Sequence, residues 1–255
     1  DPVWLGVAMS VPARQLGPGG GNQGIAPAGL HGVSRQPEMR LIFVLGDSEE
    51  ETATLARLVL RDASDLIARR KMRMETLLNR SYVRTGDARF DKALHWAKIS
   101  LDALIMRQVK PGIFAGLPWF DNYWGRDSFI ALPGATLVTG GFREAREILR
   151  SFAEWQDTIP TRPTYGRIPN LVTTASTTYN TADGTPRFVI ALDEYAKSSG
   201  DTAFANSLWP VVRRSVDGTL RHHTDSLGFL RHLDAETWMD AVGPERFFPT
   251  VRAAV

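Results

Sequence analysis

Apolar residues recur at helical spacing along most of this chain, from Ser48 to Leu220. Spacings of three and four residues predict about six amphipathic helices in succession. Such helices can bury their apolar stripes only against one another, so the pattern constrains the fold to a mainly α domain. The expected helices form three consecutive pairs, over residues 49–78 and 88–105, 128–139 and 142–155, and 186–199 and 202–220.

Residues with capping side chains precede these stretches. Ser48 and Glu51 form a capping box, with the Glu51 side chain expected to reach back to Ser48. A side-chain oxygen at such a position accepts a backbone N–H that the first helical turn leaves free. The other expected N-caps are Asp87, Asp127 or Ser128, Thr185 (followed by Pro186), and Asp201.

Residues 1–46 have a different pattern. Short β-type runs at residues 3–8 and 39–45 predict two strands, joined through a Gly/Pro-rich stretch that lacks the Gly-Lys-Ser/Thr ending of a phosphate-binding loop. Two strands cannot bury a core alone. We therefore expect residues 1–46 to be the end of a β-sandwich domain and residues 47–255 to belong to the helical domain, so that the chain is a fragment.

Charge and cysteine content narrow the function classes. The formal net charge is only +2, which favours neither a nucleic-acid partner nor a membrane surface. Cysteine is absent, which excludes disulfides and thiolate chemistry. The longest apolar run, residues 41–45, is much shorter than a membrane span. We expect a cytoplasmic protein without a membrane segment; nothing in the sequence indicates its oligomeric state.

The segment at residues 116–128 combines large aromatic side chains with charges. These side chains are Trp119, Phe120, Asp121, Tyr123, Trp124, Arg126 and Asp127. Indole rings stack on the apolar face of a sugar, and an Arg–Asp pair can hold neighbouring hydroxyls. A buried aromatic loop whose Arg and Asp pair with each other would have the same composition. Both interpretations remain open on this segment alone.

Two further segments lie between helix pairs, at residues 179–183 and 237–240. They carry Asn180 and Asp183, and Trp238 and Asp240. Asp183 follows Asp127 by 56 residues, and Asp240 follows Asp183 by 57. This period equals one helical hairpin with its loops. If each hairpin runs out and back, the three site segments (residues 116–128, 179–183 and 237–240) open at the same end and form one concave site.

Carboxylates are the candidate reactive groups. The sequence has no pattern typical of a serine triad or a zinc site, and His222-His223 is typical of a surface pair. No metal or cofactor is expected. Two carboxylates on either side of a glycosidic bond can hydrolyse it, one as acid and one as base. Asp240 follows Trp238 and Met239, and an apolar wall would raise its pKa; otherwise it would be read as a helix cap or an ion-pair partner.

The site segments resemble a known family. Gly116-Leu-Pro-Trp-Phe with Trp124-Gly-Arg-Asp-Ser, then Tyr179-Asn-Thr-Ala-Asp, then Thr237-Trp-Met-Asp-Ala are similar to the amylo-α-1,6-glucosidase domain of glycogen debranching enzymes, with the shorter bacterial members the more similar. The resemblance runs in order from about Arg40 to the C-terminus. Trp-Gly-Arg-Asp alone would be less specific, because related (α/α)6-barrel glycosidases carry similar motifs.

The resemblance implies an (α/α)6 toroid, an inverting mechanism and release of glucose from an α-1,6 branch of an α-glucan. Residue by residue, it implies that Arg126 and Asp127 bind hydroxyls of the terminal glucose and that Asp240 is the general acid. The implied pocket residues are Trp119, Phe120, Asp121, Trp124, Asn180, Asp183 and Trp238.

Two departures from the family pattern affect this interpretation. The catalytic base of such enzymes is a Glu well downstream, expected here beyond Val255, and Glu236 is too near Asp240 to act on the opposite face of the sugar. Three hairpins are also half of a six-hairpin ring, so we expect residues 47–255 to be the first half of the toroid. The alternatives are another (α/α)6 α-glucosidase or phosphorolytic relative, a catalytically inactive glucan-binding protein, and a structural scaffold.

Overall fold

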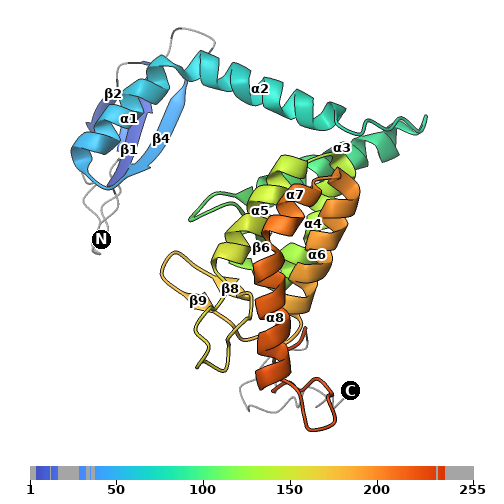
Figure 1. The fold of residues 1–255 in the computed structure, drawn as a ribbon. Helices are drawn as coiled ribbons and strands as arrows, with labels where there is room; N and C mark the ends of the chain where they lie inside the picture. The colour runs from blue at the N-terminus through green and yellow to red at the C-terminus, as the bar shows by residue number, and fades with distance from the viewer. Residues whose placement is uncertain are drawn as a thin grey trace. The chain divides into compact units, whose positions relative to one another are not determined.

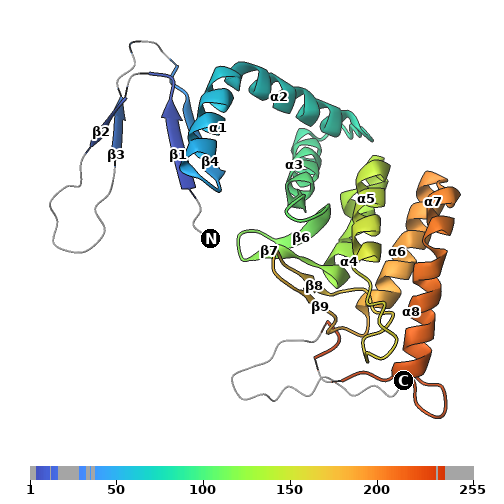
Figure 2. The same ribbon diagram turned by 60° about the vertical axis from the view of Figure 1, so that its left-hand side comes forward.

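Short strands open the chain, and helices make up most of its remaining length (Figures 1 and 2). The computed structural model describes residues 4–11, 13–16, 29–32, 35, 38–233 and 235–238. It divides into two compact units, Asp1–Thr76 and Leu77–Val255. The expected mainly helical class is therefore confirmed, while the complete toroid, the β-sandwich and the domain boundary at residue 46 stay predictions.

The first unit contains the two expected strands. β1 (Trp4–Met9) pairs antiparallel with β4 (Leu41–Gly46), with Trp4 opposite Gly46. Another antiparallel pair, β2 (Ala13–Leu16) and β3 (Gly29–Gly32), lies in the Gly/Pro-rich part of the sequence and was not predicted. Helix α1 (Glu49–Arg61) packs against β1 and β4.

The capping box at the start of α1 is confirmed with one difference. The Glu51 N–H donates to Ser48 Oγ at 3.2 Å, as expected of an N-cap. The Glu51 carboxylate, however, accepts the N–H of Asp47 at 3.1 Å rather than that of Ser48. The expected long helix over residues 49–78 is wrong, because the helix breaks at Asp62 and α2 (Ala63–Asn79) follows.

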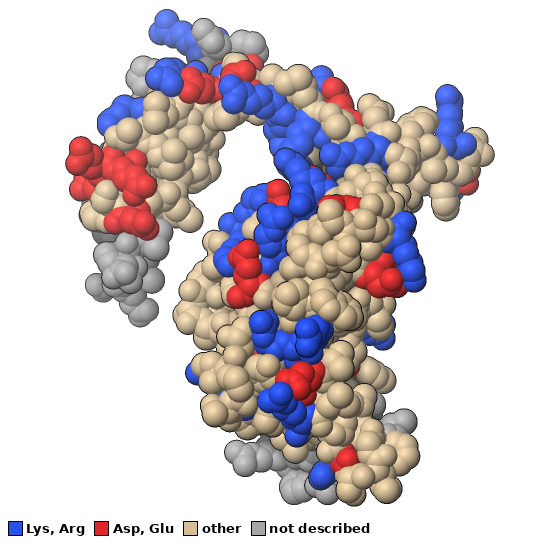
Figure 3. Space-filling view, in the orientation of Figure 1, with Lys and Arg blue, Asp and Glu red and all other residues tan. Residues whose placement is uncertain are grey.

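Basic side chains cover much of α1 and α2. Figure 3 shows Lys and Arg gathered along α2. The exposed basic residues of the two helices are Arg57, Arg61, Arg69, Arg70, Lys71 and Arg73. Their side chains are exposed, as is usual for charged residues on a solvated helix face.

The second unit begins with a helix and a small antiparallel sheet. α3 (Ala88–Leu104) leads into a sheet with the strand order β5-β6-β7-β8-β9. Its strands are β5 (Ile105–Met106), β6 (Gly112–Gly116), β7 (Phe120–Trp124), β8 (Leu171–Val172) and β9 (Thr177–Thr178). The aromatic site segment is therefore a β-hairpin that enters a helix, where the sequence predicted a loop.

Helices make up the rest of this unit. They are α4 (Gly125–Ala135), the 3₁₀ turn η1 (Leu137–Thr139), α5 (Phe142–Glu154), α6 (Gly184–Ser199), α7 (Thr202–Ser207) and α8 (Trp209–His222). Within the described parts of the chain, no helix is both long and apolar enough to cross a membrane.

The core of this unit lies where α4, α5 and α6 meet. Phe129 of α4 contacts Phe152 of α5 and Phe188 of α6 edge to face, with ring centroids 4.8 and 5.4 Å apart. All three rings are buried. Tyr123, from the aromatic site segment, belongs to this core rather than to a surface site, and its hydroxyl accepts the N–H of Gln108 at 2.7 Å.

Local sequence predicted some helix starts and missed others. Asp87 and Asp201 are N-caps as expected, and each accepts N–H groups of the first turn. The caps predicted at Asp127 or Ser128 and at Thr185 are wrong: α4 begins after Trp124 and α6 after Asp183, neither with a side-chain cap. Contacts with the loop at residues 157–178 explain this, since the Thr185 hydroxyl is used by the N–H of Ile168 at 2.9 Å.

Candidate functional site

The first two site segments meet where α4 and α6 begin. These helices pack side by side (Figures 1 and 2). Arg126 lies in the first turn of α4 and Asp183 is the N-cap of α6, and Arg126 Nη1 is 3.7 Å from Asp183 Oδ1. Because both helices start at this point, they run parallel, and the positive ends of both helix dipoles lie beside the ion pair.

Asn170 fixes the start of α4 and was not singled out in the sequence. It is fully buried. Its backbone carbonyl accepts the N–H of Gly125 at 2.6 Å, and its side-chain oxygen accepts the N–H of Arg126 at 3.4 Å. Its amide also donates to Asn180 Oδ1 at 3.5 Å, which links the first and second site segments.

The available signal for Asn170 was weak. Ile168 and Leu171-Val172 make a short apolar run inside a loop that is otherwise rich in Thr and Pro, and such a run indicates burial. The run does not indicate which helix the neighbouring Asn would contact.

Gly125 is required by this close approach. A Cβ atom added there would overlap the carbonyl oxygen of Pro169. Glycine therefore lets the backbone at residues 169–170 lie against the first turn of α4. The glycine of the Trp-Gly-Arg-Asp motif thus has a packing role beside the charged residues that follow it.

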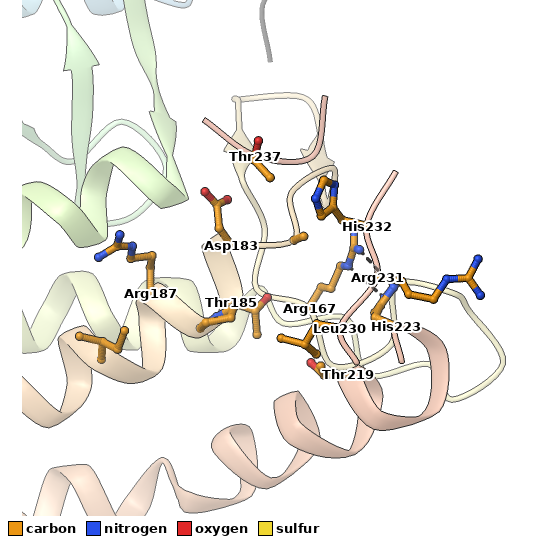
Figure 4. Close-up of a pocket in the computed structure, with 13 residues that line it drawn as sticks. Arg167, Asp183, Thr185, Arg187, Thr219, His223, Leu230, Arg231, His232 and Thr237 are labelled. Atoms are coloured by element: carbon orange, nitrogen blue, oxygen red, sulfur yellow. Dashed lines mark hydrogen bonds between the residues drawn. The ribbon is translucent and has the colours of Figure 1, made fainter. Parts of the chain in front are cut away.

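The third site segment joins the second through Glu236. The backbone carbonyl of Glu236 accepts the N–H of Ala182 at 2.7 Å. Asp183 and Thr237 line the same cavity, of about 510 Å³, together with Arg167, His223 and His232 (Figure 4). Residues from segments far apart in the sequence therefore share one concave surface.

Arg167 lies at the centre of a buried polar cluster beside this cavity. Its Nη1 donates to Glu236 Oε1 at 2.8 Å and to the carbonyl of Tyr179 at 2.9 Å, and its Nε donates to His223 Nε2 at 3.1 Å. Figure 4 shows Arg167 beside His223. The expectation of a surface pair is confirmed for His222, which is exposed, whereas His223 is only partly exposed and lies against Arg167.

The cluster sets the protonation of two of its members. Burial alone would raise the pKa of Glu236, but the hydrogen bonds from Arg167 and from the Leu233 N–H, with the Arg167 charge, bring that pKa below its ordinary value. Burial and the Arg167 charge both lower the pKa of His223, against a smaller opposing effect of Glu236. At neutral pH the cluster therefore holds an ionised Glu236 and a neutral His223.

Several polar atoms near the ion pair have unused hydrogen-bonding capacity. Among the described residues, the buried atoms Trp124 Nε1, Thr181 Oγ1 and Asp183 Oδ1 make no hydrogen bond. Leaving such atoms unsatisfied is costly. They come from the first and second site segments, and a ligand or water with several hydroxyl groups would satisfy them.

Other expected site residues lie on the surface. Trp119 is 83% exposed, Phe120 56% and Trp238 74%. Asp121 and Asp127 are exposed as well. Asp240, the expected general acid, lies outside the described residues. Among those that are described, no group of three acidic or histidine side chains could hold a metal ion.

Comparison with known proteins identifies what this chain resembles. Residues 72–252 match the family described as Amylo-alpha-1,6-glucosidase. A relative, the glycogen debranching enzyme of Saccharomyces cerevisiae, is 40% identical over an alignment of 90 residues, and this match covers 33% of this chain and 5% of the yeast protein. The chain thus matches only a small part of that relative's length. All three site segments fall within the family match.

The contact at Gly125 can be tested within one helix. Gly125→Ala should lower the free energy of unfolding by about 1–3 kcal/mol, because the new methyl group displaces the backbone at Pro169. Gly134→Ala, at the other end of α4, is the matched control, since a Cβ there meets no atom within 4 Å. Urea unfolding of both variants measures the difference; equal stability of the two would contradict the packing role.

The His223 environment predicts a pH dependence. Its folded-state pKa is lowered, so the unfolded chain takes up this proton at a higher pH than the folded chain does. The stability linked to His223 is fully present above the ordinary histidine pKa of about 6.5. It is lost as the pH falls through the lowered pKa of the folded state. Between pH 7.5 and 5.5, the wild-type melting temperature should therefore fall further than that of His223→Gln. The control is His222→Gln, whose melting temperature should fall as far as that of the wild type over the same pH range.

Proposed function

This chain belongs to the amylo-α-1,6-glucosidase family, and from that premise we propose that it is a glycoside hydrolase that releases glucose from α-1,6 branch points of glycogen-like α-glucans. The observation that carries the proposal is the meeting of Arg126 and Asp183, beside buried polar atoms with unused hydrogen-bonding capacity. A glucose residue has the several hydroxyl groups that such an arrangement can bind.

Binding of the terminal glucose is assigned to the helix starts. Arg126 donates to sugar oxygens and Asp183 accepts from sugar hydroxyls, each through charge-assisted hydrogen bonds. Asn180, held by Asn170, and the indole N–H of Trp124 add neutral contacts to the same sugar. We assign Trp119, Phe120, Asp121, Asp127 and Trp238 to the rim of the site, where exposed aromatic rings suit stacking against the neighbouring sugars of a polymer.

Hydrolysis is assigned to Asp240 as general acid. It protonates the oxygen of the glycosidic bond while a second carboxylate activates a water molecule on the opposite face of the sugar. In inverting enzymes these two carboxyl groups lie about 6.5–9.5 Å apart to leave room for the water.

Glu236 is not suited to either catalytic role. Its carboxylate is held by Arg167 at 2.8 Å and by the N–H of Leu233 at 2.8 Å. An acid must carry a proton at the working pH, whereas the pKa of Glu236 lies below its ordinary value. A base must face the water molecule, whereas this carboxylate faces a buried guanidinium.

Replacing the proposed acid tests the reaction. Asp240→Asn in the intact protein should lower glucose release from a branched limit dextrin by about 10²- to 10⁴-fold, because the amide cannot protonate the leaving oxygen. The control is Asp217→Asn, which breaks an exposed ion pair with Arg221 on α8. Inversion also predicts that the first product is β-glucose, detectable by NMR. Unchanged turnover would remove Asp240 from the mechanism, and a need for phosphate would indicate a phosphorolytic relative.

Binding is tested separately, in the Asp240→Asn background, so that the substrate stays intact. Adding Asp183→Asn should weaken binding of an α-1,6-branched oligosaccharide by about 10- to 100-fold, the effect expected for one charged hydrogen bond. Asp193→Asn, on an exposed turn of the same helix, should leave affinity unchanged. Isothermal titration measures both. If binding behaves as stated but the wild type shows no turnover, the chain is a glucan-binding protein instead.

A further inference from the structure

We propose that the buried Arg167–Glu236 ion pair is a clamp that positions the third site segment, and with it Asp240, against the glucose-binding residues of the second. Arg167 and Glu236 are positioning residues in this proposal, because neither is assigned a contact with substrate. The inference rests on the proposed function, since it assigns the clamp a place in that reaction.

The clamp has two attachments on the side of Arg167. One guanidinium nitrogen, Nη1, donates both to Glu236 Oε1 and to the carbonyl of Tyr179, at 2.8 and 2.9 Å. Nη2 also reaches Glu236 Oε2, at 3.4 Å. Tyr179 opens the second site segment, and Glu236 directly precedes the third. One side chain therefore ties both segments to the loop that carries Arg167.

Glu236 adds two attachments of its own. Its backbone carbonyl accepts the N–H of Ala182, the residue before Asp183, at 2.7 Å. Its carboxylate accepts the N–H of Leu233 at 2.8 Å, which fixes the turn that leads into the third segment. Both the backbone and the side chain of Glu236 are therefore held by hydrogen bonds, and the residue is only 8% exposed.

Chain connectivity relates the clamp to Asp240. Asp240 is the fourth residue after Glu236 along the chain. Holding Glu236 against Ala182 restricts where a general acid can stand relative to Asp183, which is the condition for protonating a bound glycosidic oxygen.

Stability alone does not explain a pair of this kind. A buried ion pair is often no more stabilising than apolar side chains of similar volume, because both charges lose their hydration. Its distinctive property is geometry, because the flat guanidinium donates hydrogen bonds to oxygen atoms only in fixed directions. The lowered pKa of His223 keeps a neutral nitrogen against Arg167 Nε, so no second cation competes for Glu236.

The test compares turnover with binding. Glu236→Gln removes the charge and keeps the shape; it should lower kcat by about 10²-fold, the cost of a misplaced catalytic group, and leave the affinity for the branched oligosaccharide within about threefold of the wild type. Arg167→Lys should show the same pattern. Glu154→Gln, which breaks an exposed pair with Lys110, is the matched control and should change neither quantity. Assays run well below each variant's melting temperature, so that unfolding does not contribute.

A merely structural pair would give a different result. In that case Glu236→Gln would lower the melting temperature and leave kcat per folded molecule unchanged, which would overturn the proposal. A parallel loss of kcat and affinity would overturn it too, because the binding residues would then have moved. If Glu236→Gln does not fold, Glu236→Asp is assayed in the same way, and it should give a smaller fall in kcat with affinity unchanged.

Hydrogen exchange separates this proposal from the proposed function. The Ala182 N–H is bonded to the Glu236 backbone, not to the substituted side chain. Glu236→Gln should speed exchange at Ala182 if the carboxylate holds the segment in place, and unchanged exchange would refute the clamp. This readout needs no turnover. If the wild type released no glucose but Glu236→Gln sped exchange at Ala182, the proposed function would be wrong. The inference that the Glu236 carboxylate holds the segment in place would still be supported.

Discussion

Two buried guanidinium groups hold the candidate site together. A buried cation is costly unless oxygen atoms surround its N–H groups, and here residues from other segments supply some of these oxygen atoms. Arg126 lies against Asp183, and Arg167 lies against Tyr179 and Glu236. Because these partners are far away in the sequence, satisfying the two charges brings the three site segments to one place.

The beginnings of α4 and α6 provide the rigid part of the site. Asn170 fixes the first turn of α4 through its backbone carbonyl and its side chain, and Thr185 ties the first turn of α6 to Ile168. The core behind them, where the rings of Phe129, Phe152 and Phe188 pack edge to face, keeps the helices parallel. Residues presented on such a scaffold can bind a small ligand without paying much conformational entropy.

Binding and proton transfer belong to different parts of the chain in the proposed mechanism. The groups assigned to glucose stand on helix starts, whereas the acid stands on a segment connected through Glu236. That separation explains the role proposed for the Arg167–Glu236 pair, because the third site segment needs a means of keeping its geometry relative to the second. The loop at residues 157–178 supplies that means through Arg167, in addition to its contact with α4 through Asn170.

Sequence reasoning succeeded where the signal is local. Helical periodicity predicted the mainly α class, and a side chain that caps its own first turn identified Ser48, Asp87 and Asp201 as N-caps. The ordered motifs also predicted the family, which the comparisons confirm over residues 72–252. The starts of α4 and α6 were missed because a tertiary contact, not a side-chain cap, decides them.

The sequence by itself determined the mainly helical class and the family. Only the tertiary structure decided that Arg126 lies against Asp183, that Asn170 links two site segments, and that Arg167 and Glu236 are paired in the interior. The physical reason is the separation along the sequence over which each interaction acts. Periodicity and capping depend on residues within one or two turns of each other, whereas the partner of a buried charge is selected by packing between segments tens of residues apart.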